Sequence, residues 1–150
     1  MMAETWIRPV PVVTAESEVF YSGLKERRFL VPRCRSCDAY NWTPYPACRS
    51  CQSMDLEWVE VSGRGTIYTF TEIHVGARPF TTDGPYIWAF AQLEEGPRPL
   101  IVMGNLIGVG PEEIQIGMPV SIGYHDIPGH DLTMYHFEPT TDATSDGAEG

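Results

Sequence analysis

Four cysteines carry the most specific chemical signal in this chain of 150 residues. They form two Cys-x-x-Cys pairs separated by ten residues, and the chain has no other cysteine. Two such turns facing each other make a tetrahedral thiolate cage, which suits Zn²⁺. Four thiolates leave no open position for water, so the spacing predicts a structural zinc site, with iron as the alternative metal and a redox dithiol disfavoured. The predicted ligands are Cys34, Cys37, Cys48 and Cys51.

Histidines are the other residues with catalytic potential. His125 and His130 are each followed by an aspartate, in a predicted loop between the last two strands. A His–carboxylate pair can act as a base or bind a second metal ion. No nucleophile or third ligand is placed nearby, so we interpret the stretch as a polar turn. A small enzyme that uses either histidine stays open as an alternative.

The elements around the cysteines are short. Residues 1–13 contain Pro9 and Pro11 and are predicted to be extended. A helix is predicted over 15–28, with Thr14 as its N-cap. Strands are predicted at 29–31, 40–43 and 56–61, which together form a three-stranded ribbon around the cysteines. A ribbon of about 35 residues buries little apolar surface, so we expect the metal to supply much of its stability.

The second half of the chain reads as a run of strands. We expect them at 66–75, 86–93, 99–106, 118–124 and 132–137, with a helical turn within 108–117. Five strands with a helical turn between the third and fourth fit a Greek-key barrel of oligonucleotide/oligosaccharide-binding (OB) type. The predicted fold class is therefore mainly β. The predicted division is an extended segment and helix (1–28), a zinc ribbon (29–62), an OB-fold (63–139) and a disordered acidic tail (140–150).

Charge is distributed unevenly along the chain, whose formal net charge is −10. Residues 25–64 contain seven cations and five acids, whereas residues 65–150 contain two cations and twelve acids. A nucleic-acid-binding surface needs many Lys and Arg contacts to phosphate, which the second half does not supply. A nucleic-acid-binding zinc-ribbon/OB module stays open as the alternative function. The chain has neither a long apolar span nor a secretory signal, so we expect a cytoplasmic protein without membrane contact.

The order of these motifs resembles a known family. The resemblance covers roughly residues 14–139, and its most specific parts are the two Cys-x-x-Cys pairs and the stretch Ser-Gly-Arg-Gly-Thr-Ile-Tyr-Thr-Phe-Thr at 62–71. Further matching stretches lie at 85–86, 93–96 and 116–120. Together they are similar to the zinc-ribbon plus OB-fold proteins that are associated with acyl-CoA enzymes and were long catalogued as a domain of unknown function.

The resemblance implies a non-catalytic accessory subunit. Members have a rubredoxin-like zinc ribbon followed by an OB barrel, and they assemble with thiolase-like enzymes or acyl-CoA hydratases. They support acetoacetyl-CoA synthesis, polyketide-like acylation or retro-aldol cleavage in steroid breakdown, while the catalytic residues lie in the partner. The four cysteines carry over as zinc ligands. A Pro-Pro-Arg sequence that often precedes the second pair is replaced here by Thr-Pro-Tyr-Pro-Ala at 43–47.

Aromatic residues and arginines of the second half are candidate contacts to acyl-CoA or to a partner protein. Strict alternation would place Tyr68 and Phe70 on one face of their strand, and Tyr86, Trp88 and Phe90 on one face of the next. Core packing is the alternative for both sets. Arginine matches phosphate oxygens in a bidentate way, so exposed arginines could meet the phosphates of CoA. The candidate contacts are Arg64, Tyr68, Phe70, Arg78, Tyr86, Trp88 and Arg98.

Overall fold

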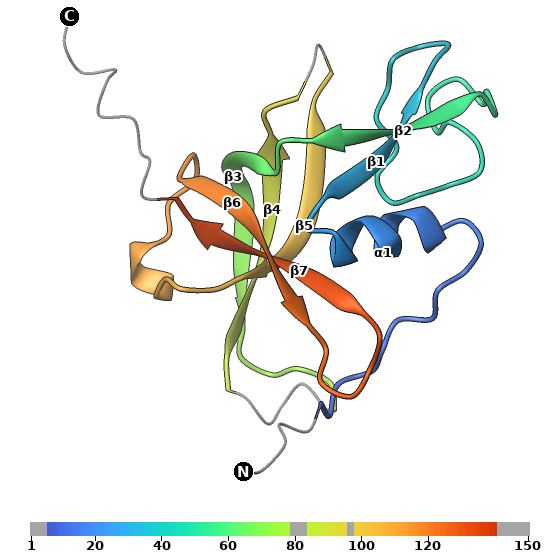
Figure 1. Ribbon diagram of the computed structural model, residues 1–150. Helices are drawn as coiled ribbons and strands as arrows, with labels where there is room; N and C mark the ends of the chain where they lie inside the picture. The colour runs from blue at the N-terminus through green and yellow to red at the C-terminus, as the bar shows by residue number, and fades with distance from the viewer. Residues whose placement is uncertain (1–5, 79–83, 96–97, 141–150) are drawn as a thin grey trace, which may run out of the picture.

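The computed structural model describes residues 6–78, 84–95 and 98–140. One helix and a two-stranded ribbon lie beside a closed five-stranded barrel (Figure 1), which confirms the predicted mainly β class with a helix, a ribbon and an OB-type barrel. The predicted tail falls almost wholly outside the described residues. The elements are α1 (Glu18–Lys25), β1 (Phe29–Cys34), β2 (Leu56–Val61), β3 (Arg64–Ile73), β4 (Tyr86–Leu93), β5 (Leu100–Leu106), the 3-10 turn η2 (Pro111–Glu113), β6 (Pro119–Asp126) and β7 (Thr133–Pro139).

Helix α1 is shorter than predicted at both ends. Thr14 is not its N-cap, because the N–H of Ser17 donates to the Thr14 carbonyl (3.0 Å) and closes a separate turn before the helix. At the other end Arg27 adopts a φ of 59°, and the N–H of Arg28 donates to the Gly23 carbonyl (2.9 Å). This left-handed turn stops the helix and sends the chain directly into β1.

The ribbon contains two paired strands rather than three. β1 and β2 are antiparallel, with Phe29 opposite Val61 and Cys34 opposite Leu56. The third strand predicted at 40–43 is reduced to one bridge between Arg33 and Tyr40. After this bridge the chain leaves the sheet, because the half-buried side chain of Trp42 packs into an aromatic cluster.

The barrel closes in the order β3-β4-β5-β7-β6, with β6 pairing back to β3. β4 alternates as predicted: its inner face is apolar and buried, and Tyr86, Trp88 and Phe90 share the outer, half-buried face. β3 does not alternate as predicted. A β-bulge leaves Tyr68 unpaired, so Ile67 lies opposite Ala91 and Thr69 lies opposite Phe90. The prediction that Tyr68 and Phe70 share a face is therefore wrong, because one extra residue reverses the alternation.

One core joins the helix, the ribbon base and the barrel. Phe20 of α1 meets Phe29 of β1, Trp42 and Tyr135 of β7, with ring centroids 5.4, 4.9 and 6.1 Å away. Buried side chains of the ribbon base and of the barrel belong to the same apolar cluster. At the rim of this joint, Arg27 donates to both carboxylate oxygens of Asp126 (2.9 and 3.1 Å). The ribbon base is thus fixed to the barrel by aromatic packing and a bidentate ion pair.

Candidate metal centre and barrel pocket

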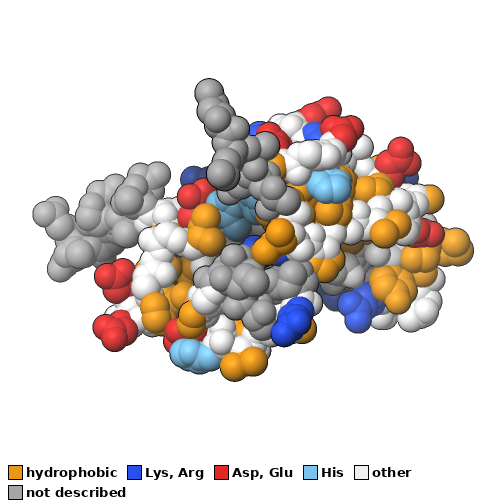
Figure 2. Space-filling view, turned by 90° about the horizontal axis from the view of Figure 1, so that it is seen from below, with side chains coloured by type: hydrophobic (Ala, Val, Ile, Leu, Met, Phe, Trp, Pro, Cys, Tyr) orange, Lys and Arg blue, Asp and Glu red, His pale blue; other side chains and the backbone are white. Residues whose placement is uncertain are grey.

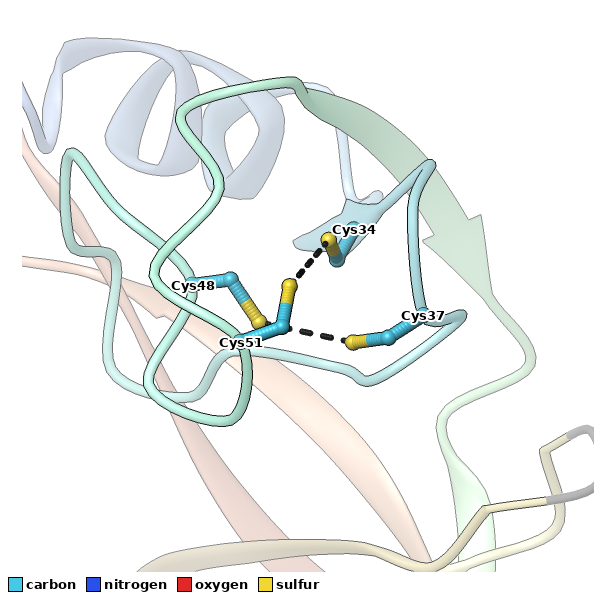
Figure 3. Close-up of side chains that lie close together, drawn as sticks. All are labelled: Cys34, Cys37, Cys48 and Cys51. Atoms are coloured by element: carbon cyan, nitrogen blue, oxygen red, sulfur yellow. Dashed lines mark hydrogen bonds between the residues drawn. The ribbon is translucent and has the colours of Figure 1, made fainter.

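The four cysteines converge on one centre at the tip of the ribbon. Their sulfur atoms all lie within 4.8 Å of one another, and Cys34–Cys51 and Cys37–Cys48 are each 3.6 Å apart. Figure 3 shows the side chains entering from two facing turns. With Zn–S bonds of about 2.3 Å, the edge of a ZnS₄ tetrahedron is about 3.8 Å, so the observed spacing fits a tetrahedral metal ion. The four cysteines are positioned to bind a metal ion.

Each cysteine pair sits in the same backbone turn, or knuckle. In the first knuckle the N–H of Cys34 donates to the Ala39 carbonyl (2.9 Å), and that of Asp38 donates back to the Cys34 carbonyl (2.9 Å). The second knuckle repeats this pattern. The N–H of Cys48 donates to the Ser53 carbonyl (2.7 Å), and the N–H of Gln52 donates to the Cys48 carbonyl (2.9 Å). Asp38 and Gln52 occupy equivalent positions, with φ of 61° and 66°. The repeated Cys-Arg-Ser-Cys sequence therefore folds twice into one geometry.

A buried asparagine, which the sequence did not predict as a structural residue, joins the two knuckles. Asn41 is only 2% exposed. Its Oδ1 accepts from the N–H of Arg49 in the second knuckle (2.9 Å), and its Nδ2 donates to the Ala39 carbonyl of the first (3.2 Å). Asn41 lies in the stretch 40–43, which was predicted as a short strand, and its role depends on contacts that spacing does not encode.

The environment of the sulfur atoms favours a bound cation. Burial opposes ionisation of Cys48, but the N–H groups of Cys51 and Ser50 outweigh it and lower the pKa of Cys48 to about 6. At Cys51 the N–H of Ser53 favours the thiolate, yet Cys34, burial and the other two cysteines together raise the pKa to about 12. Four thiolates this close repel one another unless a positive ion lies between them. The donor set therefore fits a metal such as zinc.

A cavity lies at the end of the barrel that Figure 2 shows from below, where apolar side chains are exposed. It has a volume of about 550 Å³ and opens between the ends of β3, β4 and β5. Its polar side chains include Arg8, Glu72 and Asn105, and nothing in the described residues donates to the buried Oδ1 of Asn105. The apolar part of its wall includes Ile73, Ile87, Trp88, Leu106, Ile107 and Val109. Apolar walls with a few polar groups are typical of small-molecule sites.

Of the two histidines predicted in the loop between the last two strands, only His130 lies there. His125 lies on β6 rather than in a loop, and its Nδ1 is 3.0 Å from the Nδ1 of His136 on β7. Burial and then the charge of His136 lower the pKa of His125. His130 is exposed in the β6–β7 turn, so the two predicted histidines do not form one site. The contact between His125 and His136 was not predicted, because it depends on the register of the two strands.

Comparison with known proteins shows which family has this combination of a ribbon and a barrel. Residues 22–57 match the family described as "ChsH2, rubredoxin-like zinc ribbon domain", and residues 58–125 match "ChsH2, C-terminal OB-fold domain". A DUF35 domain-containing scaffold protein of Methanocaldococcus jannaschii is 32% identical over 123 residues, which cover 77% of this chain and 85% of that protein. The chain belongs to the DUF35 family.

Two further proteins extend the comparison. A chain of a solved structure named "Ltp2-ChsH2(DUF35) aldolase" is 32% identical, with a TM-score of 0.71 and coverage of 87% of this chain and 98% of that chain. A probable enoyl-CoA hydratase alpha subunit of Thermomonospora curvata is 32% identical over 133 residues. That alignment covers 89% of this chain but 40% of the relative, so this chain spans less than half of that protein.

The structure brings together only part of the predicted contact set of this DUF35 chain. Tyr86 and Trp88 line the barrel pocket, and the other five candidate residues do not. Arg64, Arg78 and Arg98 are exposed, so among the described side chains the pocket has Arg8 as its one cation. Tyr68 is exposed at the bulge, and Phe70 packs against the core. No helix in the described parts of the chain is long and apolar enough to cross a membrane.

Proposed function

We propose that this chain is an accessory subunit that binds a thiolase-like or aldolase-like enzyme and helps it handle acyl-CoA substrates. The likeness to a chain of the structure named "Ltp2-ChsH2(DUF35) aldolase" carries the proposal, because it extends over 98% of that chain at 32% identity. A relative named as an enoyl-CoA hydratase alpha subunit supports the same class of substrate. In this proposal the chemistry takes place in the partner, on thioesters of lipid or steroid breakdown.

The ribbon provides the rigid half of this function. Cys34, Cys37, Cys48 and Cys51 would hold a structural Zn²⁺, which cross-links the two knuckles and has no open position for a reacting water. Asn41 fixes the knuckles to each other through two hydrogen bonds. The ribbon tip is therefore a preformed surface, and docking it costs little conformational entropy.

The barrel pocket provides the substrate-handling half. Its apolar wall fits the acyl part of a thioester better than the nucleotide part, because each phosphate needs cationic partners. Arg8 and Glu72 have opposite charges, so their formal charges cancel. The exposed Arg64, Arg78 and Arg98, predicted as phosphate contacts, do not line this pocket. We assign the pocket to the apolar acyl group.

Co-expression with a thiolase-like, aldolase-like or hydratase subunit from the same genome tests the main proposal. We expect the two to elute as one complex with a defined mass and with bound zinc. We also expect the turnover of acyl-CoA by the partner to fall when this chain is omitted. Two separate elution peaks together with unchanged partner turnover would contradict the proposal.

A matched pair of substitutions tests the role of the pocket. Ile107 lies on the pocket rim and is 47% exposed, whereas Ile116 is 71% exposed and lies outside the lining. We expect Ile107→Asp to raise the KM of the complex for long or ring-bearing acyl-CoA several-fold, because it places a charge beside the apolar wall. Ile116→Asp should leave KM unchanged. Equal effects of the two variants would remove the pocket from the proposal.

A further inference from the structure

The two knuckles have the same sequence, Cys-Arg-Ser-Cys, but their arginines have different surroundings. Arg35 of the first knuckle lies 3.3 Å from Glu57 and 3.5 Å from Asp55, so its charge is balanced within the ribbon. Arg49 of the second knuckle has no carboxylate within 4 Å among the described residues. Its guanidinium carbon instead lies 5.9 Å from the ring centroid of Tyr45.

This difference sets Arg49 apart from every other cation between α1 and the end of β2. Each of the others lies within 4 Å of a carboxylate; they are Lys25, Arg27, Arg28, Arg33 and Arg35. Within this stretch of described residues only Arg49 lacks a carboxylate partner, although the net charge of the chain is −10. Internal pairing therefore does not account for the position of Arg49.

Exposed side chains precede and follow Arg49 along the chain. Tyr45 is 58% exposed and is held between Pro44 and Pro46, and Met54 in the following loop is 77% exposed. The backbone of Arg49 is fixed by the bond from its N–H to the buried Asn41. Tyr, Arg and Met are enriched at the centres of protein interfaces, where preformed aromatic and guanidinium groups dominate affinity.

We propose that Tyr45, Arg49 and Met54, the second-knuckle face, form the surface that docks on the partner enzyme, where a carboxylate flanked by apolar side chains receives Arg49. The proposal rests on the proposed function and specifies which part of the chain meets the partner. A carboxylate is the expected counterpart, because a guanidinium near an aromatic ring can still donate two parallel hydrogen bonds in its plane.

The charge distribution argues against other macromolecules at this face. A nucleic acid or an anionic membrane presents many phosphates and is bound by clusters of Lys and Arg. The ribbon offers one unbalanced cation, and the barrel next to it is strongly acidic. One arginine on an exposed aromatic ring fits a single acidic side chain on a folded protein.

Matched charge changes in the two knuckles test the proposal. The probe is the enzyme subunit that co-elutes with this chain in the co-expression experiment, titrated into the zinc-loaded chain by calorimetry. We expect Arg49→Gln to weaken binding at least tenfold and Arg49→Glu at least a hundredfold. Arg35→Gln, at the equivalent position, should change the affinity less than threefold. The affinity of the unaltered chain should fall with added salt more steeply than that of Arg49→Gln.

Zinc content and melting temperature of each variant establish that the fold is intact, since Arg49 makes no ion pair within the described chain. Tyr45→Ala is a second variant and should also lose at least fivefold in affinity. If Arg49→Glu and Tyr45→Ala bind as well as the unaltered chain, the docking face is overturned while the proposed function stands. If the unaltered chain forms no complex, both fail. If Arg49→Glu changes only the self-association of the chain, the face belongs to a homodimer and the proposal is wrong.

Discussion

The ribbon tip and the barrel are both small β structures, but different interactions hold them. The barrel buries apolar side chains from all five strands, many of them fully. The ribbon tip has a separate small cluster in which two of the three buried residues are the cysteines Cys34 and Cys48. Cysteine sulfur atoms occupy the interior of the tip in place of an apolar core. The tip therefore depends on a metal ion, whereas the barrel depends on the hydrophobic effect.

The boundary between the two kinds of stabilisation does not coincide with the start of the barrel. Phe29 and Val31 of β1 belong to the barrel core, although they lie in the same strand as Cys34. Removal of the metal should therefore affect the tip of the ribbon and spare its base. Each of the following predictions perturbs one side of this boundary or the joint between the two sides.

The largest effect is expected from removal of the metal by a chelator or by Cys37→Ser. Metal binding contributes on the order of 10 kcal/mol to the folding of small zinc domains, so residues 34–56 should lose their fixed structure. Residue-resolved amide NMR and metal content per chain measure this, and signals of the barrel and of Phe29 and Val31 should persist. Ser36→Ala, beside Cys37, is the control and should keep the metal. Unchanged tip signals in the metal-free protein would mean that the tip folds without it.

A smaller effect is expected from Phe20→Ala at the joint. Phe20 is buried against Phe29, Trp42 and Tyr135, and deleting a buried phenyl ring costs about 3–5 kcal/mol. Because the ring contacts both the ribbon base and the barrel, urea unfolding should change from one transition to two. Val19→Ala, at the neighbouring and 38% exposed position, should keep a single transition and lose much less stability. Similar losses for the two variants would show that the joint does not couple the two parts.

Within the barrel, Gly65→Ala tests close packing of β3 against β4. A Cβ atom at this position would lie 2.2 Å from the carbonyl oxygen of Gln92, which is backbone and has little freedom to move. Overpacking of this kind costs about 1–3 kcal/mol, so the melting temperature should fall while zinc content stays at that of the unaltered protein. Gly110→Ala is the control, because nothing lies within 4 Å of its added Cβ. Loss of zinc together with barrel stability would mean that the ribbon cannot hold the metal alone.

The same contrast explains which features the sequence could predict. The metal ligands were predictable because the four cysteines encode their geometry locally, through two short turns. Strand positions were predictable from alternation, but the bulge at Tyr68 was not, because β3 alternates without interruption and the irregularity exists only in its pairing with β4. The barrel pocket could be predicted only through Tyr86 and Trp88, since its wall combines side chains from three strands and the N-terminal segment.

Polar contacts were the least predictable part. Nothing in the stretch 40–43 sets Asn41 apart from other polar residues, and only the folded ribbon gives it two partners in different knuckles. The same holds for Arg35 and Arg49, each of which stands in the sequence Cys-Arg-Ser-Cys. Asp55 and Glu57 follow the second knuckle but pair with the arginine of the first. Which of two equivalent arginines is balanced is thus decided by the tertiary fold.

The smallest effect is expected at the ion pair that crosses the rim of the joint. Hydrogen bonds from Arg27 and then from Thr133 lower the pKa of Asp126 from 3.8 to about 2. Because the folded-state pKa is depressed, the stabilisation is complete above pH 3.8 and is lost as the pH falls from 3.8 towards 2. Arg27→Met should move the carboxyl titration of Asp126, followed by NMR, towards 3.8 and remove this pH dependence. Lys25→Met, which breaks the neighbouring exposed pair with Asp131, should leave the titration of Asp126 in place. An Asp126 titration that is the same in Arg27→Met and in the unaltered protein would assign the low pKa to Thr133 instead.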